Sequence, residues 1–249
     1  MTTASRFVRR ISTALPLGPR EREALASLLV QTTRAEAGRD LILDGGTVDY
    51  GYVFESGWGC RYKLVEDGRR QILNFVVPGD YVGASGGIVH AADHSIAALT
   101  PVELLVFPAA ALREIGDRLP RLRAALEWSS RRDLSILQER IVDIGRRSAY
   151  ERMAHLMLEL QHRLELVGLA DGTGFDLPLT QETLADALGL TVVHVNRTLR
   201  RLRESGALLV ASGRVTISDR AALVRIADFD DSYLHQGPMP DKTLDRLVS

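Results

Sequence analysis

Cysteine is almost absent from this sequence, because Cys60 is the only one among 249 residues. One cysteine cannot form a disulfide within the chain, and it cannot supply an all-cysteine iron–sulfur or zinc site. The lack of paired cysteines fits a reducing compartment. Cys60 itself has two interpretations: a small core residue of a strand, or a redox-responsive thiol whose thiolate Arg61 and Lys63 stabilise.

Long apolar runs and an excess of charge are missing as well. No segment approaches the roughly 20 apolar residues of a membrane-spanning helix, and the start, MTTASRFVRRISTALPLG, lacks the apolar core of a secretory signal. The formal net charge is −1, so any nucleic-acid binding must come from a local basic surface. We therefore expect a soluble, cytoplasmic globular protein without a membrane-bound part.

The motifs of common enzyme classes are also missing. The sequence contains no GxSxG, no HExxH, no P-loop and no glycine-rich dinucleotide fingerprint at the start of a helix. His90, Asp93 and His94 are close together, but no third metal ligand is identifiable, so loop histidines are the simpler interpretation. We expect no enzymatic activity and no metal site.

The pattern of the sequence changes along the chain. Residues 5–30 indicate two short helices separated by Pro16 and Pro19. Residues 34–107 alternate short β-branched or aromatic runs with glycine-rich turns, which is typical of a sandwich or barrel. We predict an α+β protein in which residues 1–115 form a jelly-roll-like β-domain, a double-stranded β-helix, with N-terminal helices.

A long helical segment follows, with Pro120 in its first turn. Spacings of three and four residues define a narrow seam along it: Leu126, Ser130, Leu134, Leu137, Ile141 and Ile144. The seam either packs on its own domain or pairs with the same helix of a second copy. We favour the second interpretation and predict that residues 116–147 form a dimerisation helix.

Two helices joined by a tight turn are predicted in the second half of the chain. The first begins after Thr180 as N-cap and ends at Gly189, and the second begins after Thr191 as N-cap and ends at Gly206. Two helices joined by about three residues that include a glycine form a helix-turn-helix.

Two short strands in ALLVASGRVTISD complete the pattern of a winged helix. The turn Ser212-Gly213 separates them and forms the tip of the wing. We assign residues 148–222 to a winged helix-turn-helix domain and residues 223–249 to a C-terminal helix and tail.

A helical wheel separates the faces of the second helix. Val195, Leu199 and Leu202 form the centre of the stripe that we predict to be buried, and Val192 and Thr198 form its edges. Val193 and Arg197 lie together on the opposite side. Other polar residues flank that pair or lie on the shoulders: Arg200, Arg201, His194 and Asn196. Arginine binds guanine O6 and N7, and valine packs on a thymine methyl, so this face fits a major groove. The alternative is a solvated, charged surface.

The order of β-roll, long helix and winged helix-turn-helix resembles the Crp/Fnr family of bacterial transcription regulators. Its most specific part is LTQETLADALGLTVVHVNRTLRRLRESGAL, in which the run HVNRTL is similar to a subset of members. A second marker, VVPGDYVG at residues 76–83, is similar to the family motif Pro-Gly-Asp-x-x-Gly. The resemblance implies a homodimer whose recognition helices enter the major groove at pseudo-palindromic sites. It also implies contact with RNA polymerase or the blocking of a promoter.

The resemblance also implies which residues contact DNA. Arg197 matches the family's base-reading arginine, whereas Val193 stands where glutamate is common. Valine cannot accept a hydrogen bond from cytosine N4, so the preferred half-site should differ. The expected set of DNA-binding residues, phosphate contacts included, is Thr180, Gln181, Thr191, Val192, Val193, His194, Asn196, Arg197, Arg200 and Arg214.

The predicted β-domain corresponds to the effector domain of this family. Its sequence differs from that of the members that bind cyclic nucleotides. In those members the motif's glycine, here Gly83, is followed by a glutamate for the ribose and later by an Arg-Ser pair for the phosphate. This chain has Ala84 and His94 at those positions, and it retains Ser95. With Ser85, these residues form the candidate effector pocket. Without the acidic acceptor and the bidentate arginine, we expect no binding of cAMP.

Other effectors are left open. A single cysteine cannot hold the iron–sulfur cluster of the oxygen-sensing members, and none of the six histidines lies in a recognisable haem motif. A constitutive regulator is also compatible with the sequence. The rival interpretation of the whole chain is a ligand-binding or interaction module that no longer reads DNA, and Arg197, Arg200 and Arg201 argue against it.

Overall fold

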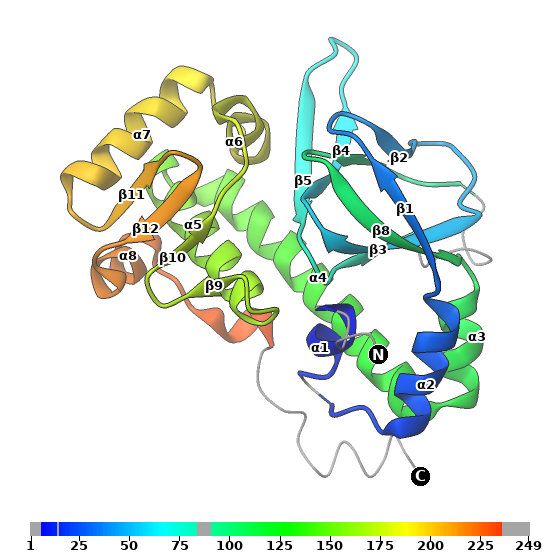
Figure 1. Cartoon of the computed structure of the whole chain (residues 1–249). Coiled ribbons are helices and arrows are strands. Elements are labelled where there is room, and N and C mark those ends of the chain that lie inside the picture. The colour runs from blue at the N-terminus through cyan, green and yellow to red at the C-terminus, as the bar shows by residue number, and fades with distance from the viewer. Residues whose placement is uncertain (1–5, 14, 84–90, 236–249) are drawn as a thin grey trace. The chain divides into compact units, whose positions relative to one another are not determined.

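The computed structural model describes residues 6–13, 15–83 and 91–235, which divide into two compact units (Figure 1). The first unit comprises the described residues of Met1–Arg61, Val76–Leu134 and Leu234–Ser249. The second unit comprises Tyr62–Phe75 and Ser135–Tyr233. The predicted α+β fold, with a β-rich N-terminal part, a long helix and a C-terminal helix-turn-helix, is confirmed.

Two short helices open the first unit. They are α1 (Arg6–Ile11) and α2 (Pro19–Leu28), and α2 has its proline in the first turn, where the missing N–H costs nothing. Phe7, Ile11 and Leu25 are fully buried in the core that these helices share with the β-domain. The two predicted helices at residues 5–30 are therefore confirmed.

Two four-stranded sheets form the β-domain. In spatial order, one contains β1 (Gln31–Ala35), β8 (Val102–Pro108), β3 (Tyr50–Ser56) and β6 (Tyr81–Val82). The other contains β2 (Asp40–Ile42), β7 (Ser95–Ala98), β4 (Gly59–Leu64) and β5 (Arg70–Val76). Phe54, Ile96 and Leu104 belong to the core of this domain, where inward side chains of β3, β7 and β8 meet.

The long helix begins later than the sequence suggested. Helix α3 (Ala111–Arg118) is followed directly by α4 (Pro120–Arg146), so residues 116–119 belong to the end of α3 and its link to α4. Pro120 is the first residue of α4, as predicted. Leu122 and Ala125 of α4 are buried in the first unit, where they join the same core as α1 and α2.

The second unit is built around α5 (Ala149–Glu165), which is buried along nearly its whole length. It starts with a capping box: Glu151 N–H donates to Ser148 Oγ at 3.4 Å, and Ser148 N–H donates to the Glu151 carboxylate at 2.6 Å. The cap at Ser148 separates α5 from α4, although the helical pattern of the sequence continues across both.

The remaining elements of the second unit form the winged helix-turn-helix and its C-terminal extension. Helices α6 (Gln181–Leu188), α7 (Val192–Glu204) and α8 (Arg220–Ala227) are followed by a 3₁₀ helix (Asp231–Leu234) that ends at the border of the unit. The wing strands β11 (Leu208–Ala211) and β12 (Arg214–Ile217) pair as predicted. A second hairpin, β9 (Ala170–Asp171) and β10 (Gly174–Asp176), extends them to a four-stranded sheet.

A cluster of buried charges lies where α4 ends and α5 begins. The Arg140 guanidinium donates to Asp143 at 3.0 Å and to Glu159 at 3.4 Å, and Arg147 donates to Asp143 at 2.8 Å. Both carboxylates have fully buried side chains. His155 Nδ1 lies 3.5 Å from Asp143, and its ring stacks on that of Tyr233 with centroids 5.7 Å apart.

Burial moves the pKa values of two members of this cluster. It raises the pKa of Asp143 from 3.8 to about 6, although Arg140 and Arg147 favour the charged form. Burial, with a smaller contribution from the same two arginines, lowers the pKa of His155 from 6.5 to about 3. Folding therefore favours a neutral imidazole at His155.

We predict that His155→Phe changes the pH dependence of stability. The folded pKa of His155 is depressed, so its contribution is present above its ordinary pKa of 6.5 and is lost as pH falls. The raised pKa of Asp143 acts in the opposite sense between its ordinary 3.8 and about 6. The wild-type unfolding free energy should consequently lose roughly 1 kcal/mol per pH unit, between about pH 6 and 4, relative to the variant.

Urea denaturation across this pH range measures the difference. Leu164→Ala is the control, because it removes a buried apolar group of α5 that does not titrate. Its stability loss should be the same at every pH. A His155→Phe curve parallel to that of the wild type would contradict the prediction.

Candidate nucleic-acid interface

Both helices of the helix-turn-helix begin with the threonine caps that the sequence predicted. Thr180 Oγ accepts from Thr183 N–H at 3.1 Å, and Thr191 Oγ accepts from His194 N–H at 3.2 Å. Gly189 ends α6 in the left-handed region, with a φ of 62°. The two threonine hydroxyls therefore orient the starts of α6 and α7, whatever else they contact.

The faces of α7 agree with the helical wheel except at Leu199 and Val192, which are more exposed than predicted. Val195 and Leu202 are fully buried, as predicted. Leu199 is only half-buried, whereas Thr198 is 7% exposed. The buried stripe is thus centred nearer to Thr198, because Leu199 lines a groove beside the wing.

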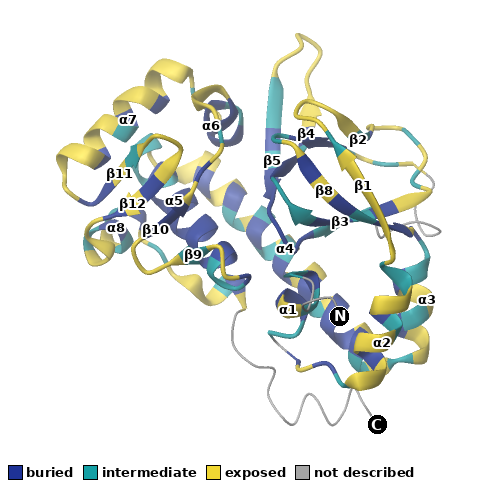
Figure 2. Ribbon diagram, in the orientation of Figure 1, coloured by how far each residue is buried: buried dark blue, intermediate teal, exposed yellow. Residues whose placement is uncertain are grey.

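The outward face of α7 carries the expected valine and arginine. Val193 is 66% exposed and Val192 is 41% exposed, and the outer side of α7 is exposed along its length in Figure 2. Arg197 is exposed, and within the described part of the chain no side chain pairs with its guanidinium. An apolar surface and a cation without a partner therefore project together from the first half of α7.

The Asn196 amide is held in one orientation. Its Nδ2 donates to the Val192 carbonyl oxygen at 3.2 Å, one turn earlier in α7. A carbonyl can only accept, so the nitrogen must be the atom on that side. The Asn196 oxygen and the second N–H are left to face outward.

The structure distributes the other expected DNA-binding residues over two sides of α7. A groove of about 520 Å³ between α7, the start of α6 and β11 is lined by Gln181, Val193, Asn196, Arg197 and Arg200, among others. Thr191 and His194 line a different cleft, on the side of α6 and the β4–β5 hairpin. The expected residues therefore do not form one continuous patch.

Three arginines near the interface already have partners within the chain. Arg200 pairs with Glu204 at 2.7 Å and Arg214 pairs with Asp176 at 2.9 Å. The Arg201 guanidinium lies 4.1 Å from the centre of the Tyr150 ring. Arg201, which the wheel placed beside the outward face, is therefore directed toward α5.

Part of the β-domain belongs to the DNA-binding unit. The Arg70 side chain of β5 pairs with Asp186 of α6 at 2.8 Å. The buried Arg163 of α5 donates to Asn74 Oδ1 at 2.9 Å and to the Phe75 carbonyl at 2.7 Å. The sequence indicates only that this hairpin belongs to the β-domain, because its pairing with α5 and α6 depends on contacts between residues nearly 90 or more positions apart.

The candidate effector residues that the structure describes make contacts within the β-domain itself. Gly83 has a φ of 72°, and a Cβ there would lie 2.7 Å from the Tyr50 carbonyl. His94 Nδ1 lies 2.6 Å from Asp93 Oδ1, and the buried Ser95 hydroxyl accepts from Asp44 N–H at 3.0 Å. Ala84, Ser85 and His90 lie outside the described residues.

The PGDYVG motif forms a turn that ties the β-domain to two helices of the first unit. Asp80 accepts from Val77 N–H at 2.9 Å and pairs with Arg10 of α1. The Tyr81 hydroxyl of the motif lies 3.4 Å from both the Leu126 carbonyl oxygen and Ser130 Oγ of α4. The motif's aspartate is therefore used for structure.

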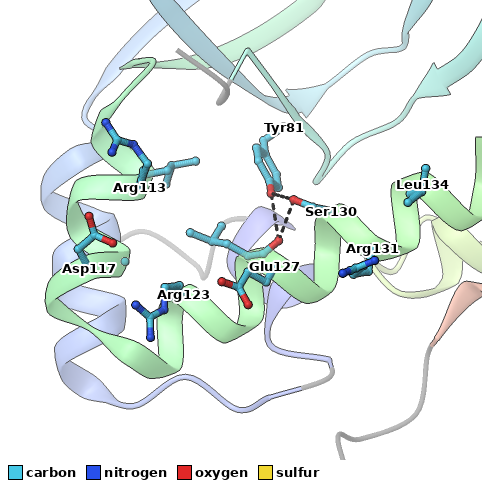
Figure 3. A pocket seen from close by; sticks show the side chains of 11 residues that line it. Tyr81, Arg113, Asp117, Arg123, Glu127, Ser130, Arg131 and Leu134 are labelled. Atoms are coloured by element: carbon cyan, nitrogen blue, oxygen red, sulfur yellow. Dashed lines mark hydrogen bonds between the residues drawn. The ribbon is translucent and has the colours of Figure 1, made fainter. Parts of the chain in front are cut away.

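A groove of about 800 Å³ lies between α3 and α4 (Figure 3). Leu126, Ser130 and Leu134 of the seam line it, and the Tyr81 hydroxyl lies 3.4 Å from Ser130 Oγ. Arginine and acidic side chains surround its rim in Figure 3: Arg113, Arg123, Arg131, Asp117 and Glu127. Half of the predicted seam thus lines an open groove.

Three residues of the seam are exposed in the single chain, while Leu137 is half-buried. Leu134 is 46% exposed, Ile141 72% and Ile144 42%. Apolar side chains with this exposure on one stripe of a helix indicate a surface that another molecule covers.

Other expected sites can be placed in the same structure. The single cysteine, Cys60, has 0% exposure, as expected for the core interpretation. The described residues contain no group of three or more side chains suited to a metal. None of the helices in that part of the chain is both long and apolar enough to span a bilayer.

Comparison with known protein families matches two parts of the chain. Residues 32–118 match the family described as cyclic nucleotide-binding domain. Residues 151–226 match the family described as Crp-like helix-turn-helix domain.

Individual relatives and solved structures agree with these matches. The nitrogen fixation regulation protein FixK of Bradyrhizobium diazoefficiens is 34% identical over 67% of this chain and 69% of its own length. The transcriptional activator protein FnrL of Cereibacter sphaeroides is 31% identical over 79% and 80%. The structure of FixK2 from Bradyrhizobium japonicum, 24% identical, has the same fold, with a TM-score of 0.71 over 79% of this chain and 96% of that one.

We predict that Gly189→Ala destabilises the helix-turn-helix. The φ of 62° at this position costs an alanine roughly 1–2 kcal/mol relative to glycine. Gly145→Ala is the matched control, since Gly145 lies in α4 and a Cβ there meets nothing within 4 Å. Urea denaturation should show a loss for Gly189→Ala and a gain for Gly145→Ala. Equal stability of the two variants would refute the assignment of the turn.

Proposed function

This chain belongs to the Crp/Fnr family of transcription regulators, and on that premise we propose that it binds pseudo-palindromic promoter sites as a homodimer. The observation that carries the proposal is the exposed pair Val193 and Arg197 on the capped helix α7. A cation that no described side chain engages and a neighbouring apolar side chain can contact the base edges in a major groove.

The recognition helix is expected to read bases through three neighbouring residues. Arg197 would donate to guanine O6 and N7, and Val193 would pack on a thymine methyl. Asn196 presents its oxygen and one N–H side by side, because its other N–H is bound to the Val192 carbonyl. That arrangement suits the N6 and N7 atoms of adenine.

A homodimer would place two recognition helices on one face of DNA. The seam on α4 supports this proposal, because Leu134, Ile141 and Ile144 leave apolar surface uncovered along one stripe. A parallel pair of such helices buries this stripe against its copy. Two recognition helices would then meet half-sites about 34–36 Å apart.

We expect the protein to activate transcription in response to a signal other than cyclic AMP. The FnrL protein is named a transcriptional activator, which favours activation through RNA polymerase over promoter blocking. Cyclic AMP is a poor candidate effector, because His94 stands in place of the phosphate-binding arginine. We expect the protein to act in the cytoplasm, where promoters are accessible.

We predict that Arg197→Ala abolishes sequence preference while binding to random DNA persists. Selection from a random duplex library should enrich a palindrome with the wild-type protein and none with the variant. Loss of a bidentate arginine–guanine contact is worth roughly 1–3 kcal/mol, about 5- to 150-fold in affinity for the selected site. Arg225→Ala, at an exposed arginine of α8, is the control and should keep the wild-type palindrome. An equal loss on selected and random DNA would show that Arg197 is not a base reader.

We predict that Ile141→Glu separates the dimer. Ile141 is 72% exposed in the single chain, so glutamate is harmless to the isolated fold but places charge in the seam. Analytical ultracentrifugation should show a wild-type dimer and a largely monomeric variant. Val30→Glu changes an equally exposed valine outside α4 and should remain dimeric. A dimeric Ile141→Glu protein would exclude the seam as the interface.

A further inference from the structure

We propose that the groove between α7 and β11 holds the sugar–phosphate backbone of one DNA strand, and that Arg203 is its main phosphate-binding residue. The inference rests on the proposed DNA binding. It goes further by assigning a positioning contact to a residue that the family resemblance did not indicate. Phosphate contacts fix where a protein sits on the duplex, whereas base contacts read the sequence.

The groove has the charge that a phosphate chain requires. Its walls are α7 on one side and Leu209 and Val210 of β11 on the other, with a volume of about 520 Å³. The guanidinium-bearing residues Arg197, Arg200 and Arg203 line it, and no described lining residue carries a carboxylate. The groove is therefore a cationic channel with one apolar wall.

Arg203, like Arg197 and unlike Arg200 and Arg214, has no partner among the described residues. Arg200 is paired with Glu204 and Arg214 with Asp176, and both acids would lie close to any phosphate that these arginines bound. No acidic side chain or aromatic ring among the described residues engages the Arg203 guanidinium. Its charge is thus available to an external anion.

Arg203 lies beyond the part of α7 that is expected to read bases. It follows Arg197 by six residues, which is about 9 Å along a helix that rises about 1.5 Å per residue. A recognition helix contacts base edges with its N-terminal residues. Arg203, in the last turn of α7, is therefore placed away from those bases and is available to a strand backbone at the border of the groove.

The opposite wall fits the sugar part of the same strand. Leu209 of the wing strand β11 is 38% exposed, although it belongs to a small, well-packed domain. An apolar side chain facing three arginines offers contact to the carbon atoms of deoxyribose. Gln181, at the start of α6, lines the same groove and adds amide N–H donors for phosphate oxygens.

Fluorescence anisotropy at several salt concentrations tests the assignment with the full-length protein. A duplex carrying the palindrome selected by the wild-type protein is compared with a random duplex. We expect Arg203→Ala to weaken binding to both by the same factor and to lower the slope of log K against log salt by about 1.8, which is about 0.9 for each subunit of the dimer. Arg203→Lys should keep the slope, because the charge remains.

Three further variants serve as comparisons. Arg200→Ala and Arg214→Ala should change the slope less than Arg203→Ala, since both arginines spend part of their charge on a carboxylate. Arg225→Ala removes an exposed arginine of the same unit outside the groove and should leave the slope unchanged. All of these side chains are exposed, so the substitutions leave the fold intact.

The outcomes separate this inference from the proposed function. If the wild-type protein binds DNA but Arg203→Ala and Arg225→Ala give the same slope, the role of Arg203 is overturned and DNA binding stands. Loss of the selected site alone, with binding to random DNA unchanged, would make Arg203 a base reader and would also overturn the inference. If the wild-type protein binds neither duplex at any salt concentration, both proposals fall together.

Discussion

The requirement that buried charges be paired organises the second unit around α5. This helix is enclosed on almost all sides, yet it carries Glu159 and Arg163 at positions that water does not reach. An unpaired buried charge is costly, so each of these groups needs a partner from a neighbouring element. Glu159 takes Arg140 from α4, and Arg163 takes Asn74 and a carbonyl from β5. The end of α4 and the β4–β5 hairpin are thereby attached to one helix.

Helices α6 and α7 are held by contacts with α5 and the β4–β5 hairpin. Arg152 of α5 donates to the Leu188 carbonyl at the end of α6 at 2.8 Å, and Arg70 of the hairpin pairs with Asp186 of the same helix. Tyr150 at the start of α5 lies under the Arg201 guanidinium of α7. The inner face of the helix-turn-helix is therefore committed to the fold. The outer side of α7 and the groove beside the wing stay exposed.

Features of the sequence that act over one or two turns were predictable. Thr180 and Thr191 cap their helices, and Gly189 adopts the left-handed conformation, because capping and turn geometry depend on neighbouring residues alone. The burial of Val195 and Leu202 followed from helical periodicity. Periodicity placed Thr198 correctly at the edge of the buried stripe. It could not show that Leu199 is half-buried and Val192 exposed, because the width of the buried stripe depends on how closely neighbouring elements approach α7.

By itself, the sequence determined the order of elements, the boundaries of α6 and α7, and the pairing of Val193 with Arg197 on one face. These features arise from backbone propensity and the helical repeat, which are local. The tertiary structure alone decided which arginines are available to an anion. Arg214 and Arg201 are engaged by Asp176 and Tyr150, which come from distant segments, and Arg203 is not engaged by any described acid. The availability of a charge depends on what folding brings beside it, and no helical wheel contains that information.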